Sequence, residues 1–347
     1  MGRLMLANIF SPFTRVTVWV TFTLAITLSV YASAQSASLP SYDKRLSTLA
    51  YPFEVQSFTL ESQGQHLSMA YMYLPPKASK PVVTLMHGKN FNGAYWEQTA
   101  AMLHEQGFGV LIPDQIGFGK SSKPTHYQYS FATLAHNTRA LLDTLKINRS
   151  IIVGHSMGGM LATRFALLYP KLTENLVLIN PIGLENYLLY ETYTDIENVY
   201  QSELKKTPDM IKRYQQKNYY DGNWNEQYAK HAAFLQGWIE GPDWDTLARV
   251  NALTYDMIFT QPVVEEFTHL NVPTTLILGT RDRTAPGRAN KRDDVTRELG
   301  RYDKLGAEIT ARNPSIQVIE LEGLGHLPQI EDFSRFKPSF IRALSTK

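Results

Sequence analysis

Two segments of alternating or continuous apolar character, residues 53–60 and 67–74, flank a short polar turn, and this pattern predicts a β-hairpin. Beyond it, short apolar runs alternate with segments of helical spacing. The runs that predict buried strands are 82–86, 110–113, 151–153 and 176–179. The segments that predict helices are 95–106, 131–145 and 158–169. Such an alternation predicts a mostly parallel sheet with helices on both of its faces.

The alternation stops at Pro181. From residue 183 to 267 the pattern is helical, polar and aromatic, and nine Tyr and three Trp lie between Leu184 and Phe267. Runs typical of strands return afterwards, and a last amphipathic helix ends the chain; these segments are 275–278, 316–321 and 333–344. The middle segment is therefore predicted to be an insertion between two strands of one sheet rather than a sequential second domain.

The length of 347 residues suits one large α/β domain with an inserted subdomain, and we predict that the chain is divided into three regions. The regions are a signal peptide at 1–34, an α/β core at 35–182 and 269–347, and a helical cap insertion at 183–268. A second, smaller insertion at about 283–313 is charged and rich in arginine. We expect this smaller insertion to lie over the surface.

The first 34 residues have the pattern of a targeting segment. Arg3 and Arg15 give a positive start, residues 16–30 form an uncharged apolar run, and Ala32 and Ala34 are small residues at the positions that a signal peptidase reads. We therefore expect cleavage after Ala34 and an exported protein, periplasmic or secreted. The alternative is an uncleaved membrane anchor, although the run is short for a span of roughly 20 residues.

Composition and charge narrow the expected partners. The chain has 34 Lys and Arg against 32 Asp and Glu, and the predicted signal peptide contains two of the Arg and no acid, so the mature chain has a formal net charge of zero. A neutral chain has no bulk field to attract nucleic acid or an anionic membrane. We expect a small, mostly neutral or apolar substrate, and membrane contact only if the N-terminal segment is uncleaved.

The absence of cysteine excludes disulfides, thiolate metal sites and a cysteine nucleophile. Acidic residues and histidines do not cluster at metal-ligand spacing, and no phosphate-binding loop is present. We therefore expect neither a metal nor an organic cofactor.

The strongest chemical signal is a G-x-S-x-G motif centred on Ser156, from Gly154 to Gly158. An apolar run precedes it and a helical pattern follows it, which is the context of a nucleophile elbow. The serine must lie on a tight, strained turn so that its hydroxyl projects above the sheet, and the glycines leave room for backbone that passes close by. The following helix directs free N–H groups at the reacting centre. Ser156 is therefore the predicted nucleophile.

A serine nucleophile needs a base and an orienting acid. His326 lies in a glycine-rich loop just after the last predicted strand, and sites in open α/β sheets form at the carboxyl ends of strands. His155 is adjacent to the serine and is expected to point away from its hydroxyl. Asp282 also follows a strand, and it gives the chain order Ser, Asp, His that serine hydrolases use. We predict His326 as base and Asp282 as acid, and interpret the alternative acid, Asp114, as structural.

The negative oxygen that forms during attack on a carbonyl needs two backbone donors. One is expected to be the N–H of Met157, directly after the nucleophile, and the other the N–H of Lys89, in a loop that follows a predicted strand. Gly88 permits close approach of this loop, and the Lys89 side chain needs no chemical role.

Together these motifs resemble the α/β-hydrolase superfamily, and the likeness spans residues 53–345. The residues that carry it are His87-Gly88, Pro113-Asp114-x-x-Gly117-x-Gly119, Gly154-His155-Ser156-Met157-Gly158-Gly159, Asp282 and Gly325-His326. The chain is most similar to the capped bacterial hydrolases, which include epoxide hydrolases, haloalkane dehalogenases, meta-cleavage-product hydrolases and proline iminopeptidase-like enzymes. The resemblance implies the α/β-hydrolase fold with an inserted helical cap and a Ser-His-Asp catalytic triad.

Two departures from these relatives affect the expected reaction. The nucleophile is serine rather than aspartate, which argues against epoxide hydrolase and dehalogenase chemistry. The loop that begins at His87 reads His-Gly-Lys-Asn rather than the His-Gly-Gly-Pro of the iminopeptidases, which argues against aminopeptidase activity.

These residues favour hydrolysis of a carboxylic ester or lactone through an acyl-enzyme intermediate. The alternatives are hydrolysis of a C–C or amide bond on the same fold, and a receptor-like protein that keeps the triad but has negligible turnover, because a fold does not decide function. The aromatic residues of the insertion are expected to form a mostly apolar pocket or to cover the insertion's own core. For any single tyrosine we expect the second.

Overall fold

The structure is a computed structural model that describes residues 39–77 and 79–345. The predicted signal peptide and its cleavage site lie outside the described residues. Within these residues, no helix combines the length and the hydrophobicity needed to cross a membrane.

The alternating segments near the start of the chain pair as an antiparallel hairpin. β1 (Val55–Ser62) pairs with β2 (Gln65–Leu74) along its whole length. The turn between them has positive φ angles at Gln63 and Gly64. Glycine adopts this conformation without strain because it has no Cβ.

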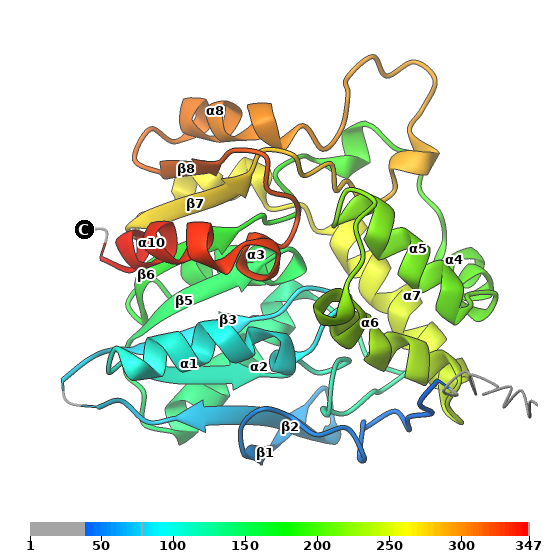
Figure 1. Cartoon of the computed structure of the whole chain (residues 1–347), viewed down its shortest axis with the longest axis horizontal. Helices are drawn as coiled ribbons and strands as arrows, with labels where there is room; N and C mark the ends of the chain where they lie inside the picture. Colours follow the sequence, from blue (N-terminus) through cyan, green and yellow to red (C-terminus); the bar gives the residue numbers. More distant parts are fainter. Residues whose placement is uncertain (1–38, 78, 346–347) are drawn as a thin grey trace, which may run out of the picture. The chain divides into compact units, whose positions relative to one another are not determined.

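The hairpin begins an eight-stranded sheet with the order β1-β2-β4-β3-β5-β6-β7-β8 (Figure 1). The remaining strands are β3 (Val82–Met86), β4 (Gly109–Pro113), β5 (Ser150–His155), β6 (Thr173–Ile179), β7 (Thr274–Gly279) and β8 (Gln317–Leu321). They pair in parallel with one another, while β2 is antiparallel to β4. Strands β3, β4, β5 and β7 are buried at every residue, and their sequences are accordingly rich in apolar residues. The predicted mostly parallel sheet is confirmed.

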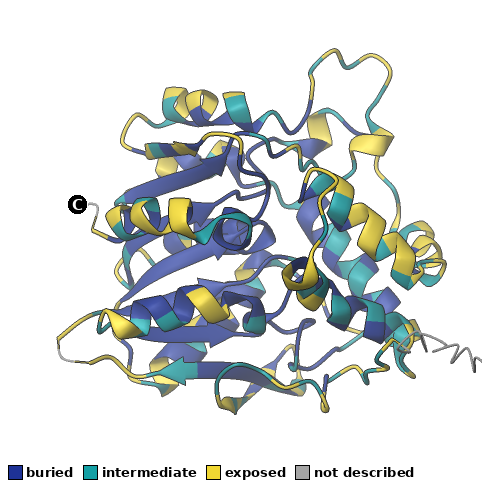
Figure 2. Ribbon diagram, viewed as in Figure 1, coloured by how far each residue is buried: buried dark blue, intermediate teal, exposed yellow. Residues whose placement is uncertain are grey.

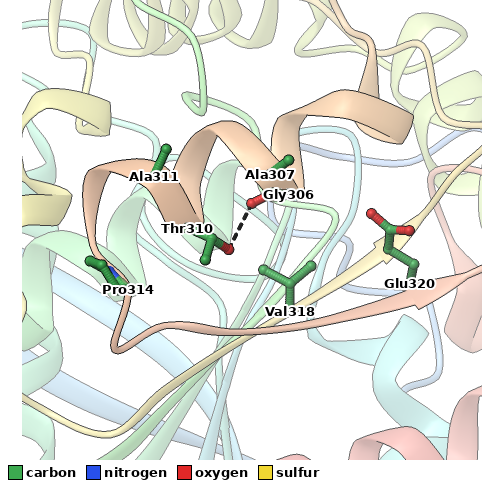
Figure 3. Close-up of a pocket in the computed structure, with 7 residues that line it drawn as sticks. All are labelled: Gly306, Ala307, Thr310, Ala311, Pro314, Val318 and Glu320. Carbon is green, nitrogen blue, oxygen red and sulfur yellow. Dashed lines mark hydrogen bonds between the residues drawn. The ribbon is translucent and has the colours of Figure 1, made fainter.

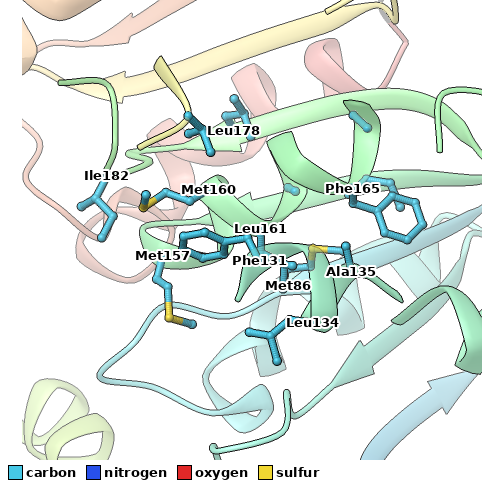
Figure 4. Close-up of a cluster of buried hydrophobic side chains, with 14 of the residues drawn as sticks. Met86, Phe131, Leu134, Ala135, Met157, Met160, Leu161, Phe165, Leu178 and Ile182 are labelled. Carbon is cyan, nitrogen blue, oxygen red and sulfur yellow. The ribbon is translucent and has the colours of Figure 1, made fainter. Parts of the chain in front are cut away.

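Helices cover both faces of this sheet, because alternate residues of each strand point to opposite sides. One face packs against α1 (Glu97–Glu105) and α10 (Phe333–Leu344), and the other against α2 (Phe131–Thr144), α3 (Met157–Leu168) and α8 (Tyr302–Arg312). Figure 4 shows part of the apolar cluster between the sheet and α2, α3 and α8, which includes Met86 and Leu178 of the strands and Phe131 and Phe165 of the helices. The central strands are buried, whereas the edge strands β1 and β8 and the outer faces of the helices have exposed residues (Figure 2).

Between β6 and β7 the described chain forms helices and turns but no strand. These elements are η2 (Tyr187–Leu189), α4 (Ile196–Leu204), α5 (Pro208–Asn218), α6 (Glu226–Ile239), α7 (Trp244–Thr260) and η3 (Val264–His269). Asp195, Thr207 and Asn225 cap three of the helices by accepting N–H groups of the first turn. We call α4 to α7 the inserted helices. The boundaries of the predicted cap stay a prediction, because residues 39–347 form one compact unit.

The charged segment at 283–313, which we expected to lie over the surface, is buried in part. Its first half contains only η4 (Arg288–Asn290), but its second half forms α8. This helix buries Tyr302, Leu305 and Ile309 in the core. The three residues have helical spacing and form one apolar face, which the many charged residues around them obscured in the sequence.

The chain before the hairpin, residues 39–51, ties the inserted helices to the core. We call it the lead-in. Two hydrogen bonds join the lead-in to α6. The N–H of Tyr42 donates to the carbonyl of Gly237 in α6 at 2.9 Å, and the indole N–H of Trp238, also in α6, donates to the carbonyl of Asp43 at 3.0 Å. Leu46 is buried beside Trp238. On the other side, the Arg45 guanidinium donates to the carbonyl of Lys120, in the loop after β4, at 2.9 Å.

Candidate active site

Ser156 lies on the sharp turn between β5 and α3, with φ 58° and ψ −123°. Residues other than glycine rarely adopt this conformation, so the surrounding structure must impose it. A Cβ at Gly154 would lie 2.1 Å from the carbonyl oxygen of Gly158, and a Cβ at Gly158 would lie 2.2 Å from that of Met86. Both glycines are therefore required by close backbone contact. The strand, turn and helix expected around the serine are all present.

The structure brings Ser156, His326 and Asp282 into one hydrogen-bonded series. His326 Nε2 lies 3.0 Å from Ser156 Oγ, and His326 Nδ1 lies 2.7 Å from Asp282 Oδ2. All three residues are buried. The carboxylate accepts the Nδ1 proton, which leaves Nε2 to accept the serine hydroxyl proton. This is the arrangement that a Ser-His-Asp mechanism needs.

Asp282 is held in its ionised form. Burial alone raises the pKa of Asp282, but the adjacent His326 and the hydrogen bonds that the carboxylate accepts hold this pKa below its ordinary value. One of these bonds comes from the N–H of Thr284, at 2.8 Å. The negative charge that would stabilise an imidazolium is therefore already in place.

Sequence analysis missed Asn180, which hydrogen-bonds to Asp282 from the end of β6. The Asn180 amide donates to Asp282 Oδ2 at 2.9 Å, and its carbonyl oxygen accepts from the N–H of Gly279 at 2.9 Å. Its φ of 36° places it in the left-handed region, which asparagine tolerates better than most residues. The one available signal was its position directly after an apolar run, at the sheet edge where Ser156 and Asp282 also lie.

The loop after β3 lies directly against the serine. A Cβ at Gly88 would be 3.1 Å from Ser156 Cβ. The N–H of Gly88 donates to the Tyr95 hydroxyl at 3.3 Å, and its carbonyl accepts from His87 Nδ1 at 2.9 Å. With both sides of Gly88 fixed, the following N–H, that of Lys89, is held next to the elbow. Among the described residues this N–H has no hydrogen-bond acceptor.

Met157 is the first residue of α3, and the first N–H groups of a helix have no acceptor within the helix. The two predicted oxyanion donors, Met157 and Lys89, therefore lie on the two segments that flank Ser156. The Lys89 side chain interacts electrostatically with Glu203 and Lys206 at the end of α4. Burial lowers the pKa of Lys89 to about 8, Glu203 raises it and Lys206 lowers it.

His155 connects His326 to the loop after β3. Its Nε2 lies 2.8 Å from the carbonyl oxygen of His326, and its Nδ1 lies 3.0 Å from the Tyr95 hydroxyl. A carbonyl only accepts, so Nε2 holds the proton and the Tyr95 hydroxyl donates to Nδ1. Burial lowers the pKa of His155 well below its ordinary value, which keeps this ring neutral. The hydrogen bonds run from Gly88 through Tyr95 and His155 to the backbone of the base.

Asp114, the alternative acid, has other partners. Its Oδ1 accepts from the N–H of Gly93 at 2.6 Å, and its Oδ2 accepts from the N–H of Lys120 and the hydroxyl of Tyr51, each at 2.7 Å. Asp114 thus joins the lead-in, the loop after β3 and the loop after β4. None of these hydrogen bonds involves His326.

Two pockets lie away from the nucleophile. A cavity of about 640 Å³ lies between α8 and β8 (Figure 3) and has no triad residue in its wall. A second, of about 320 Å³, lies between the lead-in and α6 and includes Phe91 and Tyr95, which back onto the site. No group of three or more His, Asp or Glu among the described residues is placed to hold a metal ion.

A family model described as serine aminopeptidase, S33, matches residues 77–326. A crystal structure of a probable hydrolytic enzyme from Pseudomonas aeruginosa PAO1 is 44% identical, covers 89% of this chain and 99% of that chain, and superposes with a TM-score of 0.86. Both matches include the residues of the candidate site.

Curated relatives match over different lengths. An uncharacterised protein of Mycobacterium tuberculosis (strain ATCC 25618 / H37Rv) is 42% identical over 105 residues, which is 30% of this chain and 30% of the relative. Lipase 1 of Psychrobacter immobilis is 24% identical over 295 residues, 80% of each protein. The first of these matches therefore spans less than a third of the relative's length.

Proposed function

Because the chain belongs to the serine aminopeptidase S33 family of α/β-hydrolases, we propose that it is a serine hydrolase that cleaves a carboxylic ester or lactone. The observation that carries this proposal is the buried series of hydrogen bonds from Asp282 through His326 to Ser156. A hydroxyl activated in this way attacks carbonyl carbon without a metal or an organic cofactor.

The proposed reaction proceeds in two halves. His326 Nε2 takes the proton of Ser156 as Oγ attacks the carbonyl carbon, and the N–H groups of Met157 and Lys89 bind the resulting oxyanion. His326 then protonates the leaving oxygen, and the acyl group stays on Ser156. Water, deprotonated by His326, releases the acid. Asp282 keeps the imidazole in one tautomer and stabilises the imidazolium in both halves.

The loop next to Ser156 supports an ester or lactone rather than a free peptide. It reads His-Gly-Lys-Asn from His87, whereas the iminopeptidases that the chain resembles have His-Gly-Gly-Pro. The likeness to Lipase 1 of Psychrobacter immobilis, a protein named for ester cleavage, points the same way. The description of the family keeps amide hydrolysis as the second candidate.

We also propose that the inserted helices form a cap over the site. The ring of Tyr219, which directly follows α5, stacks on the ring of His326 with the centroids 4.8 Å apart. The cap would then supply one wall of the substrate pocket and limit access of water.

A panel of short-chain aryl esters, lactones and amides tests the proposal, together with a fluorophosphonate probe. We expect the probe to label Ser156 and the esters or lactones to turn over fastest. Ser156→Ala is expected to lose the label and roughly six orders of magnitude in kcat, because nucleophile and base act as one unit. Its melting temperature should stay close to that of the parent.

Faster turnover of amides than of esters would reject the proposed substrate class. Substantial turnover by Ser156→Ala on a substrate of the parent would reject the proposed triad.

A further inference from the structure

Tyr219 belongs to the inserted segment, yet it contacts three parts of the proposed active site. Its ring lies over the imidazole of His326, with the two planes 24° apart. Its carbonyl oxygen passes over Gly325, where a Cβ would lie only 2.5 Å from it. Its hydroxyl accepts from the Asn90 amide at 3.0 Å. One residue thus contacts the predicted base, the loop that holds it and the loop next to Ser156.

The hydrogen bond between Tyr219 and Asn90 has a fixed direction. The Asn90 amide nitrogen can only donate, so the Tyr219 oxygen accepts from it. Burial raises the pKa of Tyr219 well above its ordinary value, so the phenol stays neutral. Tyr219 is 3% exposed and His326 is 0% exposed, so the contact between the two rings is shielded from water.

We propose that Tyr219 is a positioning residue that completes the active site from the inserted helices, supporting the His326 imidazolium with its ring and holding the loop next to the nucleophile with its hydroxyl. The inference rests on the proposed function, because it assumes that His326 becomes charged during turnover. Tyr219 itself exchanges no proton with the substrate.

The physical basis is the charge distribution of the aromatic ring. The face of a phenol ring is negative, and a cation within about 6 Å of its centroid is attracted to it, more strongly where water is excluded. A neutral imidazole gains much less from the same contact. The contact therefore stabilises the imidazolium, which forms as Ser156 loses its proton, more than it stabilises the resting state.

The other neighbours of His326 do not supply the same interaction. The ring of His155, 4.9 Å away, is neutral. Asp282 is ionised and hydrogen-bonded to Nδ1. Arg281 and Glu331, near Gly325, pair with each other. The Nε2 of His326 faces the uncharged hydroxyl of Ser156. Replacement of Tyr219 therefore changes the environment of the imidazole without removing any of these charges.

Two substitutions separate the ring from the hydroxyl. Tyr219→Phe keeps the stacked ring and removes the bond to Asn90, so kcat should fall about 3- to 10-fold while the acid limb of the kcat/KM–pH profile stays in place. Tyr219→Leu removes the ring, so kcat should fall about 10- to 100-fold and the acid limb should move to lower pH by about half a unit or more. KM should change little, because the contact acts in the transition state.

Tyr193→Leu is the matched control. Tyr193 lies in the same inserted segment, is 51% exposed and bonds to Asp256 away from the triad. Its kcat and pH profile should equal those of the parent. A melting curve for each variant separates loss of folding from loss of catalysis.

Parental kcat and an unmoved pH profile in Tyr219→Leu would overturn the inference, as would a shift of the acid limb to higher pH. Ser156→Ala in the same assay distinguishes this result from failure of the proposed function. If turnover needs Ser156 and Tyr219→Leu is without effect, only the role of Tyr219 is wrong. If turnover does not need Ser156, the proposed mechanism fails, and the inference about Tyr219 fails with it.

Discussion

Asp282 and Asp114 are both buried aspartates that follow a strand, and their hydrogen bonds give them different tasks. Asp282 accepts from the imidazole of His326, whereas Asp114 accepts only from two backbone N–H groups and a tyrosine hydroxyl. Asp282→Asn keeps the shape but presents an amide where His326 Nδ1 needs an acceptor. We expect a loss of about four orders of magnitude in kcat with Ser156 still in place.

Asp114→Asn is the comparison for this prediction. Its amide nitrogen would face N–H donors, so we expect a lower melting temperature and a smaller, more variable loss of activity. Both variants are assayed near pH 8 on an ester that the parent hydrolyses. An inactive Asp114→Asn beside an active Asp282→Asn would contradict the assignment of the acid.

Glu191 is a buried acid with an unusual pH response. It is 3% exposed, and neither of its carboxyl oxygens has a hydrogen-bond partner among the described residues. Burial and the nearby Glu185 raise the pKa of Glu191 to about 8, while Arg288 lowers it. The folded protein therefore holds this proton more tightly than the unfolded chain. The stability that the proton contributes is fully present below about pH 4.5 and is lost as the pH rises to about 8.

Glu191→Gln removes this ionisation while keeping the size of the side chain. We expect the melting temperature of the variant, relative to that of the parent, to be higher at pH 9 than at pH 5. Thermal melts at pH 5, 7 and 9 measure the difference. A difference that stays constant across this range would show that Glu191 does not titrate as the structure implies.

At the scale of elements, the strands of the core were predictable because buried parallel strands read as continuous apolar runs. The turn at Ser156 was predictable because a strand, a G-x-S-x-G sequence and a helix in this order are typical of a nucleophile elbow. Helix α8 was not, because only three apolar residues, Tyr302, Leu305 and Ile309, mark its buried face within a charged segment.

The positions of Asn180, Tyr95 and Tyr219 at the site were also beyond the sequence pattern. Each contacts a residue far away in the chain: Asn180 bonds to Asp282, Tyr95 to His155, and Tyr219 stacks on His326. The pairing of strands and the packing of helices create these contacts, and neither is encoded in local spacing. We expected a tyrosine of the insertion to cover the insertion's own core, but Tyr220, stacked on Tyr228, belongs to the apolar cluster of the sheet core, and Tyr219 stacks on His326.

At the scale of the whole molecule, the lead-in connects the inserted helices to the core by hydrogen bonds. It bonds to Gly237 and Trp238 in α6 on one side and to Lys120 in the loop after β4 on the other. Lys120 also donates its N–H to Asp114, whose other oxygen holds the N–H of Gly93. The inserted helices and the loops around the nucleophile therefore share one set of contacts.

We propose that the protein is exported and cleaved after Ala34, so that the mature chain begins at Gln35 and keeps the whole lead-in. N-terminal sequencing of the exported protein should then begin at Gln35, whereas a retained Met1 in the membrane fraction would favour an anchor. A protein that starts at Glu54, just before β1, instead loses the lead-in with Tyr42, Asp43 and Leu46.

The Glu54 protein should be less stable than the Gln35 protein. It loses the burial of Leu46, worth about 2 kcal/mol, and two hydrogen bonds to α6, worth about 1 kcal/mol each. With an unfolding entropy of about 2.1 cal/mol/K per residue, each kcal/mol lowers the melting temperature of a chain of this length by about 1.5 °C, so we expect a decrease of about 6 °C. Ester turnover should decrease at temperatures below this transition too, because α6 loses its anchor. The two proteins, both produced without a signal peptide, are compared by thermal melts and kcat at 25 °C. Equal melting temperatures would mean that the contacts of the lead-in do not hold the inserted helices in place.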